Sequence, residues 1–327
     1  MKSIKIIAAA IAVSTSFSSL ADPMLIQQWS FTNEAGFFNP EFTRKPANAV
    51  NDPTVDGDSA DGGTSILSTG ALPDNVCWGD AVSTRKGQSC LKINSPVTNE
   101  STETWNENGE WVNITDGSAQ GNAVTAAIGE DYTHFFKQGT ALRHDNFPIT
   151  GQFLDGVTIV DGIQLQAVMP TGIEVNAPEL MFLVDFWETP NGGLDADGTC
   201  PFGPAARTPE SINEKGCSDI FQMLPASDAS TTIAIINRGD DFIDFSVKFK
   251  VQGVDAALYH RDYELITRLS GLSVVGESIG FATRENGVNV LNAQFAIRAI
   301  DAPEPSTLAI FAASLLALSG FTRRKAK

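Results

Sequence analysis

The sequence predicts an all-β fold, an antiparallel β-sandwich or jelly roll, with a signal peptide before it and a short transmembrane helix after it. Three observations lead to this fold class. Many short segments alternate apolar and polar residues, turn-forming Gly, Asn, Asp or Pro residues bound them, and no convincing helical period lies between them. Residues 22–300 are enough for one large domain, and no linker or fixed-period repeat divides them.

The N-terminus has the features of a secretory signal peptide. Lys2 and Lys5 precede an apolar run over residues 6–13, and the small residues Ser19 and Ala21 fit the cleavage groove of signal peptidase. We therefore expect residues 1–21 to be removed during export. A buried N-terminal helix is the alternative interpretation.

An acidic, glycine-rich loop lies near the start of the predicted domain. Asp56, Asp58 and Asp61 offer oxygen ligands and are the best calcium candidate in the sequence. The loop departs from an EF-hand because Ala60 occupies the fifth position and Asp61 the sixth, where glycine is needed. Solvated acidic turns are the alternative. A second candidate loop, with the same alternative, contains Asn191, Asp195 and Asp197.

The four cysteines form two local pairs, Cys77 with Cys90 and Cys200 with Cys217. An exported chain meets an oxidising compartment, so we expect disulfides. Four cysteines allow three connectivities, and we favour the local one because each pair brackets a loop rich in turn residues. A zinc site is the alternative, but the sequence has no C-x-x-C spacing and no histidine near a cysteine.

Asn108-Gly109 is the strongest hairpin signal, since both residues tolerate a positive φ. A two-residue turn would pair Trp105 with Val112 and place Trp111 on the opposite face. One tryptophan is then expected in the core and the other at the surface. An exposed indole would suit a sugar ring, and an edge contact within the domain is the alternative.

The clearest strand covers residues 245–251, in which every second residue is apolar, so one face should be buried and the other wet. Residues 180–187 form a nearly continuous apolar run, which predicts a central strand covered on both faces. Further strands are expected at residues 157–160, 163–168, 232–236, 263–267 and 294–300.

His144 and Asn146 stand two residues apart on an extended segment and would share a face. They could orient a ligand or a metal, or make side-chain hydrogen bonds that fix a loop. No Ser-His-Asp or Cys-His assembly can be drawn from the three histidines. A glycan hydrolase would need two carboxylates about 5 to 10 Å apart in a cleft, and acidic residues are too abundant to nominate a pair.

The C-terminal tail, residues 301–327, has a proline-containing spacer, an apolar segment and a basic end. Its parts are Pro303-Glu304-Pro305, residues 308–321, and Arg323 with Arg324. The apolar segment is shorter than the roughly 20 residues that comfortably span a bilayer. It can still anchor the chain in the inner membrane, and the basic end predicts a cytoplasmic tip with the preceding domain outside.

This tail resembles the PEP-CTERM sorting signal of Gram-negative bacteria. The resemblance implies recognition by an exosortase, an integral-membrane enzyme that would cleave near the Pro-Glu-Pro and pass the protein to the surface. Prolines hold the peptide extended and accessible outside the bilayer. A plain membrane anchor with a proline-containing linker is the alternative.

The middle of the chain is similar to a subgroup of these proteins known for a THxN motif. Arg143 replaces its threonine, so the match at this position consists of His144, Asn146, Pro148 and Ile149. The resemblance implies architecture and location, with no established biochemical activity. Its other segments are Cys77-Trp78-Gly79, residues 87–91, residues 186–191, residues 217–221 and residues 280–285.

The net charge limits the classes of partner that the protein can bind. The net charge is −17, and without Lys2, Lys5 and the four basic residues after Thr322 it becomes −23, which disfavours nucleic acid. We expect a non-enzymatic cell-surface or biofilm-matrix protein that meets exopolysaccharide or calcium. The alternative is a secreted glycan-active hydrolase or carbohydrate-binding module on a jelly-roll fold.

Overall fold

The computed structural model describes residues 23–83, 87–114, 123–126, 132–169, 171, 173–225, 232–255 and 258–300. The predicted signal peptide and sorting tail lie outside the described residues, including Pro303, Glu304, Pro305, Arg323 and Arg324. Over the described part, no helix has the length and apolarity needed to cross a membrane.

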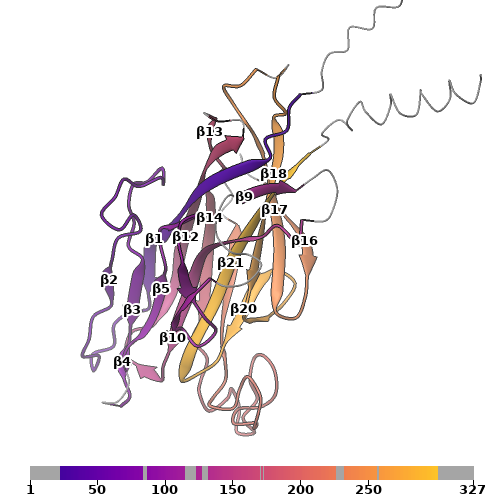
Figure 1. The fold of residues 1–327 in the computed structure, drawn as a ribbon. Coiled ribbons are helices and arrows are strands. Elements are labelled where there is room, and N and C mark those ends of the chain that lie inside the picture. Colours follow the sequence, from indigo (N-terminus) through magenta and orange to yellow (C-terminus); the bar gives the residue numbers. More distant parts are fainter. Residues whose placement is uncertain are drawn as a thin grey trace, which may run out of the picture.

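The described chain is all-β and folds into two antiparallel sheets along the long axis of an elongated body (Figure 1). This confirms the predicted all-β antiparallel class. The first sheet has the order β1 (Gln28–Phe42), β12 (Leu154–Met169), β14 (Leu180–Trp187), β15 (Asp219–Pro225) and β20 (Ile279–Thr283), with the short strands β6 (Val97–Thr98), β13 (Glu174–Asn176) and β19 (Ser273–Val274).

The second sheet has eight strands in the order β2 (Thr54–Asp56), β3 (Asn75–Trp78), β5 (Ser89–Ile93), β10 (Lys137–Asn146), β21 (Gly287–Ala299), β18 (Asp262–Ser270), β17 (Phe242–Lys250) and β16 (Ile233–Arg238). Strand β9 (Ala123–Ala126) pairs antiparallel with β1 and parallel with the end of β21, and so connects the two sheets into one closed barrel. Two small ribbons complete the fold, β4 (Asp80–Ala81) with β11 (Ile149–Thr150) and β7 (Glu103–Trp105) with β8 (Trp111–Asn113).

The predicted strands at 157–160 and 163–168 are one strand, β12, which runs through Gly162. A side chain at Gly162 would come within 2.9 Å of Leu67, so glycine here permits close packing and does not end the strand.

The core lies between the two sheets. Its largest cluster contains Phe37, Phe221 and Phe281 from the first sheet and Trp78 and Phe245 from the second. Full burial of one such side chain stabilises the fold by roughly 1.5 to 3 kcal/mol, so packing across this layer is the main source of stability.

Two expectations about individual strands are wrong. The apolar run of β14 is buried on one face only, and Leu183 and Trp187 remain 48% and 49% exposed, because the outer face of this sheet meets solvent. In β17 the apolar face is buried as predicted, but Asp244 and Ser246 on the opposite face are buried as well.

The hairpin register also differs from the predicted one. Trp105 pairs with Trp111, so both indoles lie on one face with their ring centroids 5.2 Å apart. The loop has three residues because Gly109 alone adopts a positive φ of 73°, while the Asn106 N–H donates to the Glu110 carbonyl over 2.9 Å. The prediction of one buried and one exposed tryptophan is confirmed, at 7% exposure for Trp105 and 58% for Trp111.

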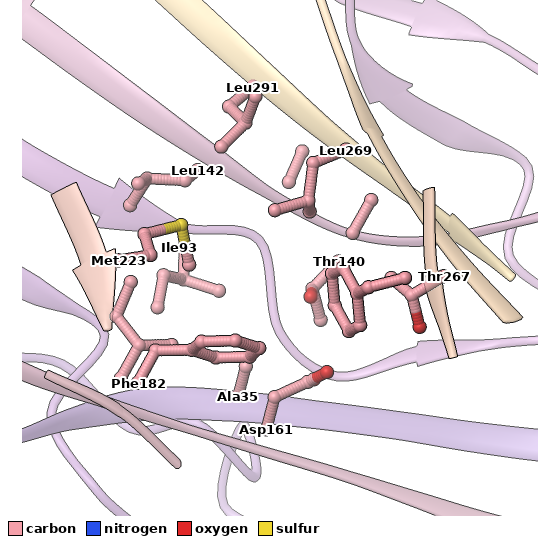
Figure 2. Close-up of a pocket in the computed structure, with 14 residues that line it drawn as sticks. Ala35, Ile93, Thr140, Leu142, Asp161, Phe182, Met223, Thr267, Leu269 and Leu291 are labelled. Atoms are coloured by element: carbon pink, nitrogen blue, oxygen red, sulfur yellow. The ribbon is translucent and has the colours of Figure 1, made fainter. Parts of the chain in front are cut away.

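A small cavity of about 50 Å³ lies between the sheets. Its lining is apolar except for Asp161, Thr140 and Thr267 (Figure 2). The Asp161 carboxylate accepts a hydrogen bond from the Asn33 amide over 2.7 Å. Burial raises the pKa of Asp161 to about 7, against the smaller opposing effect of this hydrogen bond.

We expect Asp161→Asn to remove a pH dependence of stability. The unfolded carboxyl ionises near pH 4 and the folded one near 7, so the folded state retains a proton that the unfolded state has lost. Stability from this residue is therefore full below pH 4 and is lost as the pH rises to 7. The variant should match the wild type at pH 4 and exceed it by about 1 to 3 kcal/mol at pH 8 in urea unfolding. The same difference in unfolding free energy between the variant and the wild type at pH 4 and at pH 8 would contradict this.

Candidate functional site

Polar side chains from both sheets meet at one end of the sandwich. His144 and Asn146 lie at the end of β10, and Asp219 is the first residue of β15. Glu188 directly follows β14, and Glu285 lies two residues after β20. The segments singled out by the family resemblance, which are far apart in the sequence, therefore contribute to one place.

Strand register explains this meeting. Asp219 pairs with Thr283 across β15 and β20 in the first sheet, while His144 pairs with Asn289 across β10 and β21 in the second. The Thr283 hydroxyl lies 3.1 Å from Nδ1 of His144 and 3.5 Å from Nδ2 of Asn146. One hydroxyl thus links the two sheets at the site.

Three carboxyl groups form the centre of the site. One oxygen each of Glu188, Asp219 and Glu285 lies within 4.8 Å of the others. The Thr189 backbone N–H donates to Oδ1 of Asp219 over 2.7 Å and fixes this carboxylate. Oδ2 of Asp219 and Oε2 of Glu188 are buried without a hydrogen-bond partner.

These carboxyl groups lie in surroundings that disfavour their charge. Burial, followed by the charges of Asp219 and Glu285, raises the pKa of Glu188. Burial and the charge of Asp219 raise the pKa of Glu285 to about 8, and burial raises the pKa of Asp219 against the hydrogen bonds of Thr189. Within the described part of the chain, the observed ion pairs do not involve these three residues. The cluster therefore needs either protons or a cation.

His144 cannot supply the missing positive charge. Its ring stacks on Trp78 at 5.7 Å and meets Phe186 edge-on at 5.3 Å. Burial lowers the pKa of His144 to about 3, so the imidazole is neutral at ordinary pH. Nε2 of His144 and Oδ1 of Asn146 are also buried without a partner.

Pro148 and Ile149 fix the chain after β10. Ile149 is buried in the core and pairs with Ala81. The Pro148 carbonyl accepts a hydrogen bond from Val82 over 3.3 Å. Gly79, with a φ of 79°, lies against Ile149 where a side chain would clash at 2.4 Å. These residues hold His144 and Asn146 in place and have no ligating atom in the cluster.

The predicted calcium loop lies elsewhere, at β2 and the following turn. Both carboxylate oxygens of Asp58 accept backbone N–H bonds, from Ala60 at 3.0 Å and Gly62 at 2.9 Å. Asp56 accepts a hydrogen bond from Asn75, and Asp61 is exposed. Calcium binding at this loop stays a prediction. Among the described residues, the group of three acids placed to share an ion is Glu188, Asp219 and Glu285.

The residues of the second acidic loop lie in different surroundings in the structure. Asn191 borders Glu285, whereas Asp197 accepts hydrogen bonds from Thr199, over 2.6 Å from its hydroxyl and 3.1 Å from its backbone N–H. Sequence reasoning therefore located Asn191 but did not nominate the three carboxyl groups. The signal for two of them was an acid adjoining an apolar strand, as in Trp187-Glu188 and Asp219-Ile220.

Both predicted disulfides are confirmed. Cys77–Cys90 joins the paired strands β3 and β5. Cys200–Cys217 closes the loop between β14 and β15 and ends two residues before Asp219. Both bridges flank the site, and they indicate an oxidising environment.

The site opens to the surface at Glu188. A cleft of about 480 Å³ is lined by Glu188, Thr189 and Asn191, and also by Trp187 and Asp155. Glu188 is half-buried, while Asp219 and Glu285 are buried. Solutes can therefore approach the cluster from one side.

No family model matches the chain, and no curated protein matches it either. The likeness to the PEP-CTERM proteins therefore rests on the residues given above.

Proposed function

We propose that this chain is an exported, non-enzymatic protein of the cell surface or biofilm matrix of a Gram-negative bacterium. The observation that carries the proposal is the pair of local disulfides, since such bonds form and persist in oxidising compartments. The predicted signal peptide at residues 1–21 supports the same location.

In this proposal the C-terminal tail directs the protein to the cell surface. Signal peptidase removes residues 1–21, the apolar segment 308–321 holds the precursor in the inner membrane, and an exosortase cleaves near Pro303-Glu304-Pro305. The order of spacer, apolar segment and basic end supports this route.

Exopolysaccharide is the proposed contact of the mature protein. Trp111 and Trp187 are half exposed, and an exposed indole offers a flat apolar face to a sugar ring. The net charge, −23 without the basic residues of the two ends, keeps the surface hydrated and disfavours nucleic acid as a partner.

Mass spectrometry of the exported protein tests the proposal. We expect the surface form, produced in a host with an exosortase, to start at Asp22, to end near Pro305, and to contain both disulfides as non-reduced linked peptides. An Arg323→Ala/Arg324→Ala variant should accumulate uncleaved in the membrane fraction. A surface form that retains residues 308–327 would overturn exosortase sorting, and reduced full-length protein in the cytosol would overturn export.

A glycan-active hydrolase is the second candidate, favoured by the cleft. Trp187, Glu188 and Asp155 line it together, and the raised pKa of Glu188 suits a general acid. Against it, two of the three clustered acids are buried, where no sugar ring fits between them. An assay of the same exported preparation for new reducing ends in host exopolysaccharide distinguishes the two candidates. Our proposal expects none. Release of reducing ends by the wild type but not by Glu188→Gln would favour the hydrolase.

A further inference from the structure

We propose that Glu188, Asp219 and Glu285 form a calcium-binding site at the end of the sandwich, with Asn191 orienting Glu285. The site is distinct from the acidic loop at Asp58. It lies where the end of β14, the start of β15 and the end of β20 come together. The site itself follows from the geometry below. The choice of calcium over magnesium rests on the proposed export.

The charge of the cluster favours a bound cation. Three carboxyl groups bring an oxygen each to within 4.8 Å of one another, and two of the residues are fully enclosed by protein. Among the described residues, no basic side chain forms an ion pair with them. The adjacent His144 packs between Trp78 and Phe186. Ionised carboxylates that are this close together and shielded from water repel one another strongly. A divalent cation between them removes the repulsion.

Two carboxylate oxygens in the cluster are free to bind an ion. Oδ2 of Asp219 and Oε2 of Glu188 are fully buried and make no direct hydrogen bond. Burial raises the pKa values of Asp219 and Glu188, against the smaller lowering effects of the nearby Asn146 and Trp78. Asp219 uses its other oxygen, Oδ1, to accept from Thr189, so the carboxylate is oriented with Oδ2 left for a ligand. A buried acceptor without a partner destabilises the folded state, and a bound cation would offset that loss.

Asn191 orients the Glu285 carboxylate. With its amide nitrogen facing Glu285, Asn191 donates to the two carboxylate oxygens over 3.1 and 3.2 Å. Gly216 permits the close approach, since a side chain there would lie 2.7 Å from the Asn191 amide and 3.0 Å from Glu285. Asn191 therefore fixes Glu285 as Thr189 fixes Asp219.

The donor set identifies the cation. The three carboxylates offer only oxygen, which suits a hard cation and not zinc or copper. Calcium takes six to eight oxygens in irregular geometry, so the cleft beside Glu188 would supply water ligands. Extracellular calcium modules bind with dissociation constants on the order of 0.1 to 1 mM, which matches an exported protein.

The test is calcium titration of the exported protein, first stripped with EDTA, by calorimetry and thermal unfolding. We expect a saturable heat and a rise in Tm with calcium chloride. Terbium, a luminescent calcium substitute, should show emission on excitation of tryptophan, because Trp78 lies beside the Glu188 carboxyl. Equimolar magnesium should not displace calcium, and displacement would overturn the assignment to calcium.

Two isosteric variants locate the ion. Glu188→Gln and Asp219→Asn should weaken calcium binding at least tenfold, and in EDTA they should be no less stable than the wild type because a buried charge is gone. That second readout separates lost ligation from misfolding. The matched comparison is Asp58→Asn in the other acidic loop, which should leave the affinity of this site unchanged. A loss in Asp58→Asn with none in the two site variants would assign the calcium to that loop and overturn the proposal.

Either of two results would overturn the site: no heat and no Tm shift for the wild type, or unchanged affinity in both site variants. These outcomes are independent of export. Calcium binding by a chain that retains its tail would leave the site in place and contradict only the proposed sorting.

Discussion

Replacement of Asp244 by alanine will lower the free energy of unfolding by about 3 to 5 kcal/mol, one of the two largest effects we expect in this protein. Asp244 is completely buried and accepts two hydrogen bonds from Arg268, over 2.7 Å from Nε and 2.8 Å from Nη2. The Arg268 guanidinium also lies over the rings of Phe136 and Phe242. Without Asp244, a largely enclosed guanidinium loses its only carboxylate partner among these contacts.

The same pair of strands provides a matched control. Lys250 and Asp262 also face each other across β17 and β18, 2.9 Å apart, but their side chains are 67% and 46% exposed. Asp262→Ala should therefore cost less than about 1 kcal/mol. Thermal unfolding should show a loss in Tm of roughly 6 to 20 °C for Asp244→Ala and little change for Asp262→Ala. Equal losses would show that burial of the pair does not determine its contribution.

Asp244 also shows where sequence reasoning about the fold succeeds and fails. Alternation at Phe245, Val247 and Phe249 identified β17 and its buried face, since side chains alternate along a strand. The pattern cannot reveal that Asp244 on the other face is buried, because its partner Arg268 comes from a different strand.

The long strand β1 was not among the predicted strands for the same reason. Asn33 and Glu34 interrupt its apolar pattern, yet both are buried. Glu34 accepts hydrogen bonds from Ser59, Ser65 and Ile66, which come from a loop more than twenty residues away. A polar residue looks like a break in a strand until the residues that satisfy it are known.

The candidate site was predictable only in part. His144 and Asn146 were nominated because they share one face of an extended segment, and they do lie in the site. The loop around Asp58 is predicted as a calcium site because several Asp residues lie close together in the sequence. In the structure Asp58 accepts backbone hydrogen bonds within the turn. Glu188, Asp219 and Glu285 are isolated in the sequence, and strand order alone brings them together.

The second large effect concerns Cys200–Cys217. Substitution of both residues by alanine should lower the free energy of unfolding by about 3 kcal/mol, because the bridge restricts the unfolded chain over a separation of 17 residues. The loop between β14 and β15 contributes Glu188 and Asn191 at its start, and Cys217 lies just before Asp219. We therefore expect the double variant to lose calcium affinity as well, by at least tenfold in calorimetry.

Cys77–Cys90 separates these two effects. Its removal by Cys77→Ala/Cys90→Ala opens a similar separation of 13 residues, so the stability loss should be comparable. It joins β3 to β5 within an existing strand pair and constrains none of the proposed calcium ligands. Calcium affinity should then survive in this variant and fall in the other at a temperature where both are folded. An equal fall in both would mean that stability in general, and not the closure of the loop between β14 and β15, holds the carboxylates together.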